Sequence, residues 1–190
     1  MNEFSHRLQD VVSGLEILKL SNTAAKIDAA LNLLVPSLSA NKPLLLCGNG
    51  GSAADALHIS GELVGRFLAE RRALNVICLT ANSAIITAWA NDYDFESIFS
   101  RQVEAHGHNG GVLLCISTSG NSINVIKALE SAKNIGMTTI GMTGEGGGGM
   151  APLCDVLIDV PSRLTPRIQE MHLVIYHFLC EQIELALDKN

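Results

Sequence analysis

Residues 112–122, VLLCISTSGNS, indicate how this chain folds. An unbroken apolar run, typical of a strand buried in a parallel sheet, leads into a turn rich in hydroxyl groups, and a helical pattern begins at Ile123. Unpaired backbone N–H groups and the positive end of the helix dipole converge on such a turn. The stretch therefore predicts a site for phosphate or another anion. The alternative is a simple helix cap, but a cap needs one hydroxyl and this turn has several.

Apolar runs and helical patterns alternate along the whole chain. The alternation predicts an α/β fold: a three-layer, doubly wound, five-stranded parallel sheet in the flavodoxin-like order 2-1-3-4-5, with extra N-terminal helices. A length of 190 residues fits one domain (1–190), with the extra helices in 1–40 and the core in 41–190. The expected strands are residues 43–47, 75–79, 111–116, 138–142 and 156–160. The expected helices are residues 3–18, 22–38, 52–68, 83–89, 95–106, 122–135, 149–153 and 166–188.

A second polar turn supports a ligand site in this sheet. In the expected order the ligand binds where the first and third strands end, at the switch point of the topology. The turn GNGGS, residues 48–52, follows the first strand, and the serine-rich turn follows the third. GNGGS lacks the Lys of a phosphate-binding NTPase loop and completes no dinucleotide fingerprint, so no nucleotide cofactor is expected. The glycine-rich run 144–149 is interpreted as a flexible surface loop.

Composition argues against several classes of protein. The net charge of −6 disfavours nucleic acid as a partner, and no apolar run is long enough to cross a membrane. The N-terminus carries charges and no apolar core, unlike a signal peptide. The five cysteines are widely spaced, which favours buried reduced thiols over a disulfide or zinc–thiolate framework. We therefore expect a cytoplasmic protein.

Two helices carry side chains that could perform chemistry. His58 and Glu62, four residues apart, share one face of a helix in an otherwise apolar region. On the last helix, Gln169 and His177 lie about 80° apart and can converge on one site. These four side chains suit zinc or a similar ion, although spacing alone leaves a metal site and a plain helix-surface pair both open. His172 lies about 140° from His177 and is expected to be a structural histidine.

Asn91 and Asp92 form a further polar break. They either reach the same crevice or end a helix, and the pattern alone favours neither. Together with GNGGS at 48–52, the His58-x-x-x-Glu62 pair, the serine-rich turn at 117–122 and RIQEMH at 167–172, they resemble the bacterial phosphoheptose isomerases. Members of that family are single sugar isomerase (SIS) domains, and the resemblance covers nearly the whole chain.

The resemblance implies interconversion of sedoheptulose 7-phosphate and D-glycero-D-manno-heptose 7-phosphate, the first step towards activated heptose. It also implies a homotetramer with sites between subunits, packed through residues 1–40, and often a zinc ion. Carried over by position, Ser117, Thr118, Ser119 and Ser122 hold the phosphate. The rest of the substrate contacts Asn49, Gly50, Gly51, Ser52, Glu62, Asn91, Asp92 and Gln169. The metal is surrounded by His58, Glu62, Gln169 and His177, and Glu62 and His177 form the acid–base pair.

A mechanism follows from the chemistry of the implied reaction. Glu62 would carry a proton between C1 and C2 through a cis-enediol, His177 would assist ring opening or shuttle a hydroxyl proton, and a metal would polarise the carbonyl. One rival is a non-catalytic relative resembling the tetrameric protein that assists bacterial replication initiation. Such relatives lose the residues corresponding to Glu62 and His177, which this chain retains. A second rival is an isomerase of another sugar phosphate, against which the helix carrying Gln169 and His177 argues.

Overall fold

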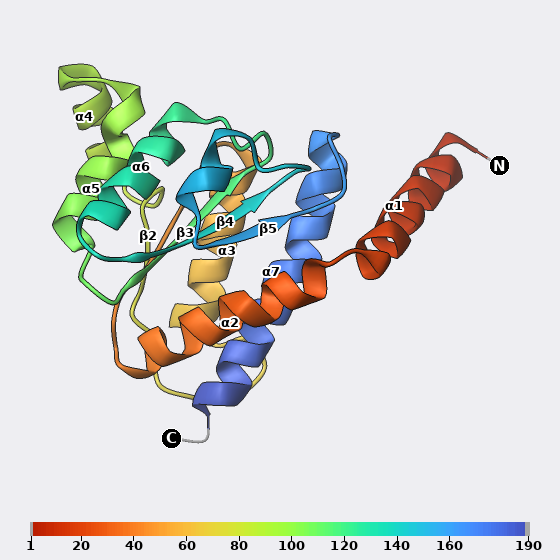
Figure 1. Ribbon diagram of the computed structural model, residues 1–190, viewed down its shortest axis with the longest axis horizontal. Coiled ribbons are helices and arrows are strands. Elements are labelled where there is room, and N and C mark those ends of the chain that lie inside the picture. Colours follow the sequence, from red (N-terminus) through yellow and green to blue (C-terminus); the bar gives the residue numbers. More distant parts are fainter. Residues whose placement is uncertain (1, 189–190) are drawn as a thin grey trace.

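The structure, a computed structural model, describes residues 2–188, so residues 1, 189 and 190 of the predicted domain lie outside it. Five parallel strands form one sheet in the order β2-β1-β3-β4-β5, which confirms the predicted topology (Figure 1). Leu46 pairs with Cys78 on one side and with Leu114 on the other, which places β1 between β2 and β3. The strands are β1 (Leu44–Gly48), β2 (Val76–Cys78), β3 (Val112–Ser117), β4 (Thr138–Thr143) and β5 (Val156–Asp159).

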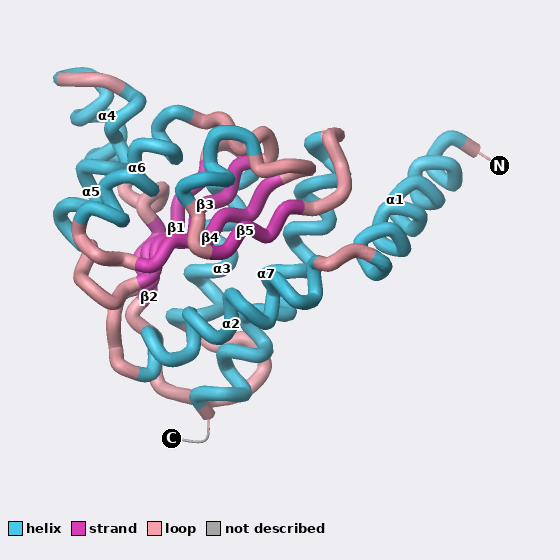
Figure 2. The backbone as a smooth tube through the Cα atoms, in the orientation of Figure 1, coloured by secondary structure: helices cyan, strands magenta, loops and turns pink. Residues whose placement is uncertain are grey.

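Helices cover both faces of the sheet, as predicted (Figure 2). The first helix, α1 (Glu3–Leu20), projects from the body of the molecule and contacts two of the helices that cover one face of the sheet. One face carries α2 (Thr23–Ser39), α3 (Gly51–Val64) and α7 (Thr165–Leu187). The other carries α4 (Ser83–Asp92), α5 (Ile98–His106), α6 (Ile123–Asn134) and the short 3-10 helices η1 (Phe95–Ser97) and η2 (Gly148–Leu153).

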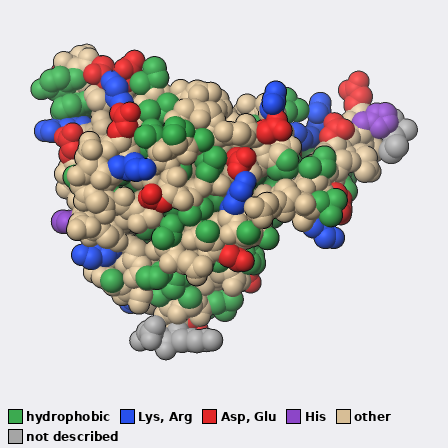
Figure 3. Space-filling model, in the orientation of Figure 1, with side chains coloured by type: hydrophobic (Ala, Val, Ile, Leu, Met, Phe, Trp, Pro, Cys, Tyr) green, Lys and Arg blue, Asp and Glu red, His purple; other side chains and the backbone are tan. Residues whose placement is uncertain are grey.

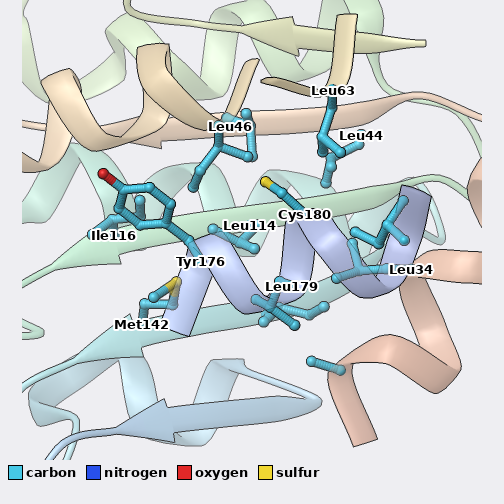
Figure 4. Packing of buried hydrophobic residues seen from close by; sticks show 14 of the residues in the cluster. Leu34, Leu44, Leu46, Leu63, Leu114, Ile116, Met142, Tyr176, Leu179 and Cys180 are labelled. Atoms are coloured by element: carbon cyan, nitrogen blue, oxygen red, sulfur yellow. The ribbon is translucent and has the colours of Figure 1, made fainter. Parts of the chain in front are cut away.

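Alternate residues of the same strands build two separate cores. In β1, Leu44 and Leu46 pack with α2, α3 and α7, whereas Leu45 and Cys47 pack with α5 and α6. Figure 4 shows the first core, in which the ring of Tyr176 on α7 lies among the apolar side chains of the sheet. Because successive side chains of a strand point to opposite faces, an unbroken apolar run can supply both cores at once.

The helix predicted at 52–68 ends earlier, at Val64. Beyond it, the backbone N–H groups of Phe67, Leu68 and Ala69 donate to the carboxylate of Glu184, at 3.0, 2.6 and 2.7 Å. These N–H groups therefore bond a side chain of α7 instead of continuing the helix. The other differences are smaller: the helix predicted at 83–89 continues to residue 92, that at 95–106 begins as η1, and that at 149–153 is the 3-10 helix η2.

A buried ion pair fixes the segment after α3. Arg71 Nε lies 3.3 Å from Glu184 Oε1, and both side chains are 1% exposed. Arg71 also donates to the carbonyl oxygens of Glu62 at 2.7 Å and Gly65 at 3.0 Å. Burial alone would raise the pKa of Glu184, but the three backbone N–H groups and Arg71 outweigh it and lower that pKa. Glu184 is therefore a buried carboxylate held in its charged form.

The glycine-rich run lies at the surface, as predicted, with residues 145, 146, 148 and 149 exposed, but its backbone is packed against the serine-rich turn. Met150 N–H donates to the Gly120 carbonyl at 2.9 Å, and Gly149 N–H donates to Asn121 Oδ1 at 2.8 Å. A Cβ on Gly120, whose φ is +65°, would lie 2.1 Å from the Gly147 carbonyl oxygen. Glycine is needed here because two backbones approach closely.

The five cysteines are all free thiols, as predicted, and four of them are buried. Cys47 and Cys115 lie in the second core with their sulfur atoms 3.3 Å apart. Among residues 2–188, no helix combines the length and the apolar character that a membrane crossing needs.

Candidate functional site

The serine-rich turn lies at the carboxyl edge of the sheet, between β3 and α6. Ser117 ends β3, and its Oγ lies 3.0 Å from the Oγ of Ser122, the N-cap residue of α6. Ser122 makes no side-chain hydrogen bond to the helix that it precedes. The first N–H groups of α6 are thus left without the usual side-chain cap, beside a cluster of hydroxyls. This geometry favours an anion site over a simple cap.

The GNGGS turn lies beside it, because β1 and β3 are neighbours. Asn49 and Asn124 exchange two amide hydrogen bonds of 2.9 Å, which join this turn to α6. A Cβ on Gly51 would lie 2.1 Å from Gln169 Nε2, so glycine at that position lets α7 approach the turn. Asn124 is only 3% exposed and sequence reasoning misses it, since a lone Asn in a helical pattern does not disclose its partner.

A third group of polar side chains lies between α3 and α7. His58 Nε2 is 3.0 Å from Glu62 Oε1, and His58 Nδ1 is 3.0 Å from the Tyr176 hydroxyl. The ring of His177 packs edge-on against that of His58, with centroids 5.0 Å apart. Phe67 covers His177 at 5.6 Å. The structure thus gathers His58, Glu62 and His177, although His177 is more than 100 residues from the other two in sequence.

Asp55 and Tyr176 belong to this group and were missed by sequence reasoning. Burial raises the pKa of Asp55, against the lowering effects of a hydrogen bond from Tyr176 and of the nearby His58. Burial, followed by the charge of Asp55, raises the pKa of Tyr176 to about 12. Asp55 precedes His58 by three residues, so the helical spacing could have placed the two on one face. No signal in the sequence points to Tyr176, an aromatic residue in an apolar helix face.

Gln169, Asn91 and Asp92 have other neighbours. Gln169 lies on the first turn of α7 against Gly51, and His177 follows eight residues later, about 12 Å along the helix axis. The Asn91 amide donates to the Asp92 carboxylate at 2.9 Å, at the end of α4, which packs on α5 and η1. The predicted contacts of these three residues with substrate or metal stay predictions.

The donors between α3 and α7 suit a metal ion. His177 Nε2 is buried and finds no hydrogen-bond partner in residues 2–188. Two imidazoles and a carboxylate are a ligand set found in catalytic zinc sites. As they stand, however, no three His, Cys, Asp or Glu side chains in the described part of the chain are arranged to hold an ion. The chemistry of these donors fits zinc. To bind the ion, His58 and Glu62 would have to give up the hydrogen bond between them and direct those atoms to the metal.

His172 is a structural residue, as predicted. Its side chain is fully buried, and Nε2 lies 3.1 Å from the carbonyl oxygen of Thr143, which ties α7 to β4. Burial lowers the pKa of His172 to about 4, so the imidazole is neutral at physiological pH.

Comparison with known proteins agrees with these features. The chain matches the SIS domain family over residues 9–144. It is 51% identical over 170 residues to the phosphoheptose isomerase of Rhodospirillum rubrum, a match that covers 90% of each chain. The chain belongs to the phosphoheptose isomerase family.

Solved structures of the phosphoheptose isomerase family share the whole fold. The phosphoheptose isomerase GmhA from Neisseria gonorrhoeae is 37% identical with a TM-score of 0.89, covering 95% of this chain and 96% of that one. The enzyme from Francisella tularensis is 35% identical with a TM-score of 0.88, covering 97% and 100%. Together these matches confirm the resemblance inferred from the motifs, including its extent over nearly the whole chain.

Proposed function

We propose that this protein is an aldose–ketose isomerase that converts sedoheptulose 7-phosphate to D-glycero-D-manno-heptose 7-phosphate, the first step towards activated heptose. The observation that carries the proposal is 51% identity to a phosphoheptose isomerase over 90% of both chains. The gathering of Glu62 and His177 in one cluster supports it, since a non-catalytic SIS protein has no need of an acid–base pair.

The phosphate is held at the serine-rich turn. Ser117, Thr118, Ser119 and Ser122 donate hydroxyl hydrogen bonds, and the N-terminus of α6 adds backbone N–H groups. The GNGGS turn contributes Asn49, Gly50, Gly51 and Ser52 to the sugar, with Asn91, Asp92 and Gln169 completing the contacts. No cationic side chain is required at this turn, because the helix N-terminus already favours negative charge.

The isomerisation moves two hydrogens between neighbouring carbons and oxygens. Glu62 removes a proton from C1 of the ketose while O2 is protonated by His177, which gives a cis-enediol. Glu62 then returns its proton to C2 while His177 accepts the proton of the O1 hydroxyl, and the C1 carbonyl forms. His177 also assists ring opening by the same kind of hydroxyl proton transfer. The ring of Phe67 packs against that of His177 and gives one side of the cluster an apolar wall.

Zinc is proposed as the metal of this site. His58, Glu62, Gln169 and His177 would hold it, and the buried, unpartnered Nε2 of His177 is the observation that supports this within residues 2–188. The ion would supply Lewis-acid polarisation of the substrate carbonyl. Gln169 of the same chain lies about 12 Å along α7 from His177, farther than its side chain reaches, so in the proposed tetramer this ligand would come from a neighbouring subunit.

A homotetramer with sites between subunits is proposed as the working form. The projecting helix α1 carries hydrophobic side chains on its surface (Figure 3). Phe4 is 73% exposed and Leu20 is 84% exposed. An apolar groove between α1, α2 and α7, of about 510 Å³, continues this surface. Glu62 lies eleven residues beyond Gly51, about 16 Å along α3. Glu62 is therefore far along the helix axis from the two turns of its own chain, which supports a site completed by a second subunit. The five free thiols support a cytoplasmic location.

The test is to incubate the purified protein with sedoheptulose 7-phosphate and to follow formation of the aldose by NMR, with and without added zinc. We expect conversion by the native chain and none by Glu62→Gln, which should keep its oligomeric state and its binding of inorganic phosphate. Glu104→Gln, an exposed carboxylate on α5, is the matched control and should turn over normally. No conversion by the native chain under either condition would favour a non-catalytic role, and normal turnover by Glu62→Gln would remove that residue from the mechanism.

A further inference from the structure

Two backbone carbonyl oxygens of the serine-rich turn are bonded by the segment that contains the glycine-rich run. The Thr118 oxygen accepts the N–H of Gly144 at 3.0 Å, and the Gly120 oxygen accepts the N–H of Met150, directly after the run, at 2.9 Å. A carbonyl oxygen directed at a bound phosphate would repel it, whereas backbone N–H groups attract an anion. This segment therefore occupies two of the groups in the turn that would oppose anion binding.

Asn121 joins the same two segments through its side chain. Its Nδ2 donates to the carbonyl oxygen of Ser119 at 2.9 Å, and its Oδ1 accepts the N–H of Gly149 at 2.8 Å. A Cβ on Gly148 would lie 2.6 Å from the Ser119 oxygen and 2.7 Å from Asn121 Oδ1, so the run packs closely on this pair. One amide group thus bonds the turn with its nitrogen and the glycine-rich run with its oxygen.

Asn121 also bonds the hydroxyl group of Ser119. The backbone N–H of Asn121 donates to Ser119 Oγ at 3.1 Å. A hydroxyl that accepts one hydrogen bond still has its own proton to donate. Because Ser119 is exposed, this proton is available to a ligand at the turn.

We propose that Asn121 is a positioning residue for phosphate, which fixes the carbonyl and the hydroxyl of Ser119 and ties them to the glycine-rich run. The inference rests on the proposed function in one respect: the anion at this turn is the phosphate of the sugar substrate. Both ends of the Asn121 amide already bond the protein, so the residue acts on phosphate through Ser119. Asn121 is exposed, so its side chain can be shortened without opening a cavity in either core.

The test measures the binding of inorganic phosphate by calorimetry and, separately, the turnover of sedoheptulose 7-phosphate. Asn121→Ala removes two side-chain hydrogen bonds and should weaken phosphate binding about tenfold, the equivalent of about 1.4 kcal/mol. The KM for the sugar phosphate should rise by a similar factor with kcat unchanged, because the phosphate is held equally in the ground state and the transition state. Native phosphate affinity in a folded Asn121→Ala variant, or a fall in kcat alone, would overturn the proposal.

Asn134→Ala is the matched control. Asn134 is exposed and is the last residue of α6, at the opposite end from the turn. This variant should bind phosphate and turn over as the native chain does. A loss equal to that of Asn121→Ala would show that the effect is not specific to the turn.

Combining Asn121→Ala with Ser119→Ala tests whether Asn121 acts through Ser119. If it does, the two losses of phosphate affinity should not add, because the second substitution removes a group that the first has already released. Fully additive losses would contradict this route.

A further pair of variants perturbs the contact from the glycine-rich run. Gly148→Ala and Gly146→Ala both place a side chain at positive φ, but only the Cβ at position 148 meets the turn, whereas that at 146 has open space. Gly148→Ala should weaken phosphate binding and Gly146→Ala should not, and equal affinities would contradict the role of the run. A native chain that binds phosphate without converting the sugar would refute the isomerase and leave the positioning role intact. A native chain that binds no phosphate would overturn the positioning role, whatever its turnover.

Discussion

Replacing Glu184 by Gln should destabilise the protein by about 3–5 kcal/mol, the range for breaking a buried ion pair from one side. The carboxylate accepts the N–H groups of Phe67, Leu68 and Ala69 and faces Arg71, and neither charged side chain is more than 1% exposed. A Gln amide keeps the volume but turns one acceptor oxygen into a donor, which leaves one or two part-buried N–H groups without partners, at a cost of about 1 kcal/mol each. The Arg71 charge is left buried without its counter-charge.

Urea unfolding followed by far-UV circular dichroism, at one fixed protein concentration and pH 7, measures this loss. Glu104→Gln is the control, since it breaks an ion pair to Arg101 whose side chains are 55% and 56% exposed, and it should cost less than about 1 kcal/mol. Adding Arg71→Met to Glu184→Gln should cost less than the sum of the two single changes, because the unpaired charge disappears. A loss below about 1 kcal/mol for Glu184→Gln would refute the reasoning that the carboxylate fixes residues 67–71.

Three further outcomes are expected. The pKa of His172 in the folded protein, about 4, lies below its ordinary value of 6.5, so the unfolded chain binds more protons between these two pH values. The free energy of unfolding should therefore fall by roughly 3 kcal/mol as the pH drops from 6.5 to 4. Urea titrations across this range should show a shallower fall for His172→Gln. Gly120→Ala should lower the free energy of unfolding by more than about 2 kcal/mol, measured by thermal unfolding, and should weaken the binding of inorganic phosphate. Gly146→Ala, also at positive φ but with open space around it, should lower that free energy by about 1 kcal/mol. Equal losses of stability in the two variants would contradict the close backbone approach at Gly120. Asn124→Ala should raise the KM for sugar phosphate about tenfold by freeing Asn49, and an unchanged KM would show that this amide pair does not orient the turn.

The sheet and the two turns could be predicted because local patterns determine them. An apolar run such as 112–116 supplies both cores whatever its partners are. A turn between a buried strand and a helix lies at the helix N-terminus, where the first backbone N–H groups have no partner within the helix. The family resemblance then added the roles of Glu62 and His177. That both of them lie against His58 could not be derived from the chain, since 115 residues separate Glu62 from His177 and helical angles describe only one helix at a time.

The parts that sequence reasoning missed depend on contacts between elements remote in the chain. Glu184 bonds the backbone beyond the end of α3 at Val64, but in sequence it is one of three acidic residues in an otherwise apolar helix. Asn124 and Tyr176 likewise act through partners on other elements. The interpretation of the glycine-rich run as a flexible surface loop missed its packing, because glycine composition alone does not disclose that another backbone, that of Gly120, passes within contact distance.

The contacts between α3 and α7 also bear on the order in which the protein is completed during synthesis. The two helices meet at three levels: Gln169 against Gly51, Tyr176 and His177 against His58, and Glu184 against residues 67–69. All five strands and the serine-rich turn leave the ribosome before α7, because the chain is made from its N-terminus. Until α7 is made, Arg71 lacks its counter-charge and His58 its contact with the Tyr176 hydroxyl. The cluster between α3 and α7 is therefore the last part of the proposed site to be completed, after both turns at the edge of the sheet have been synthesised.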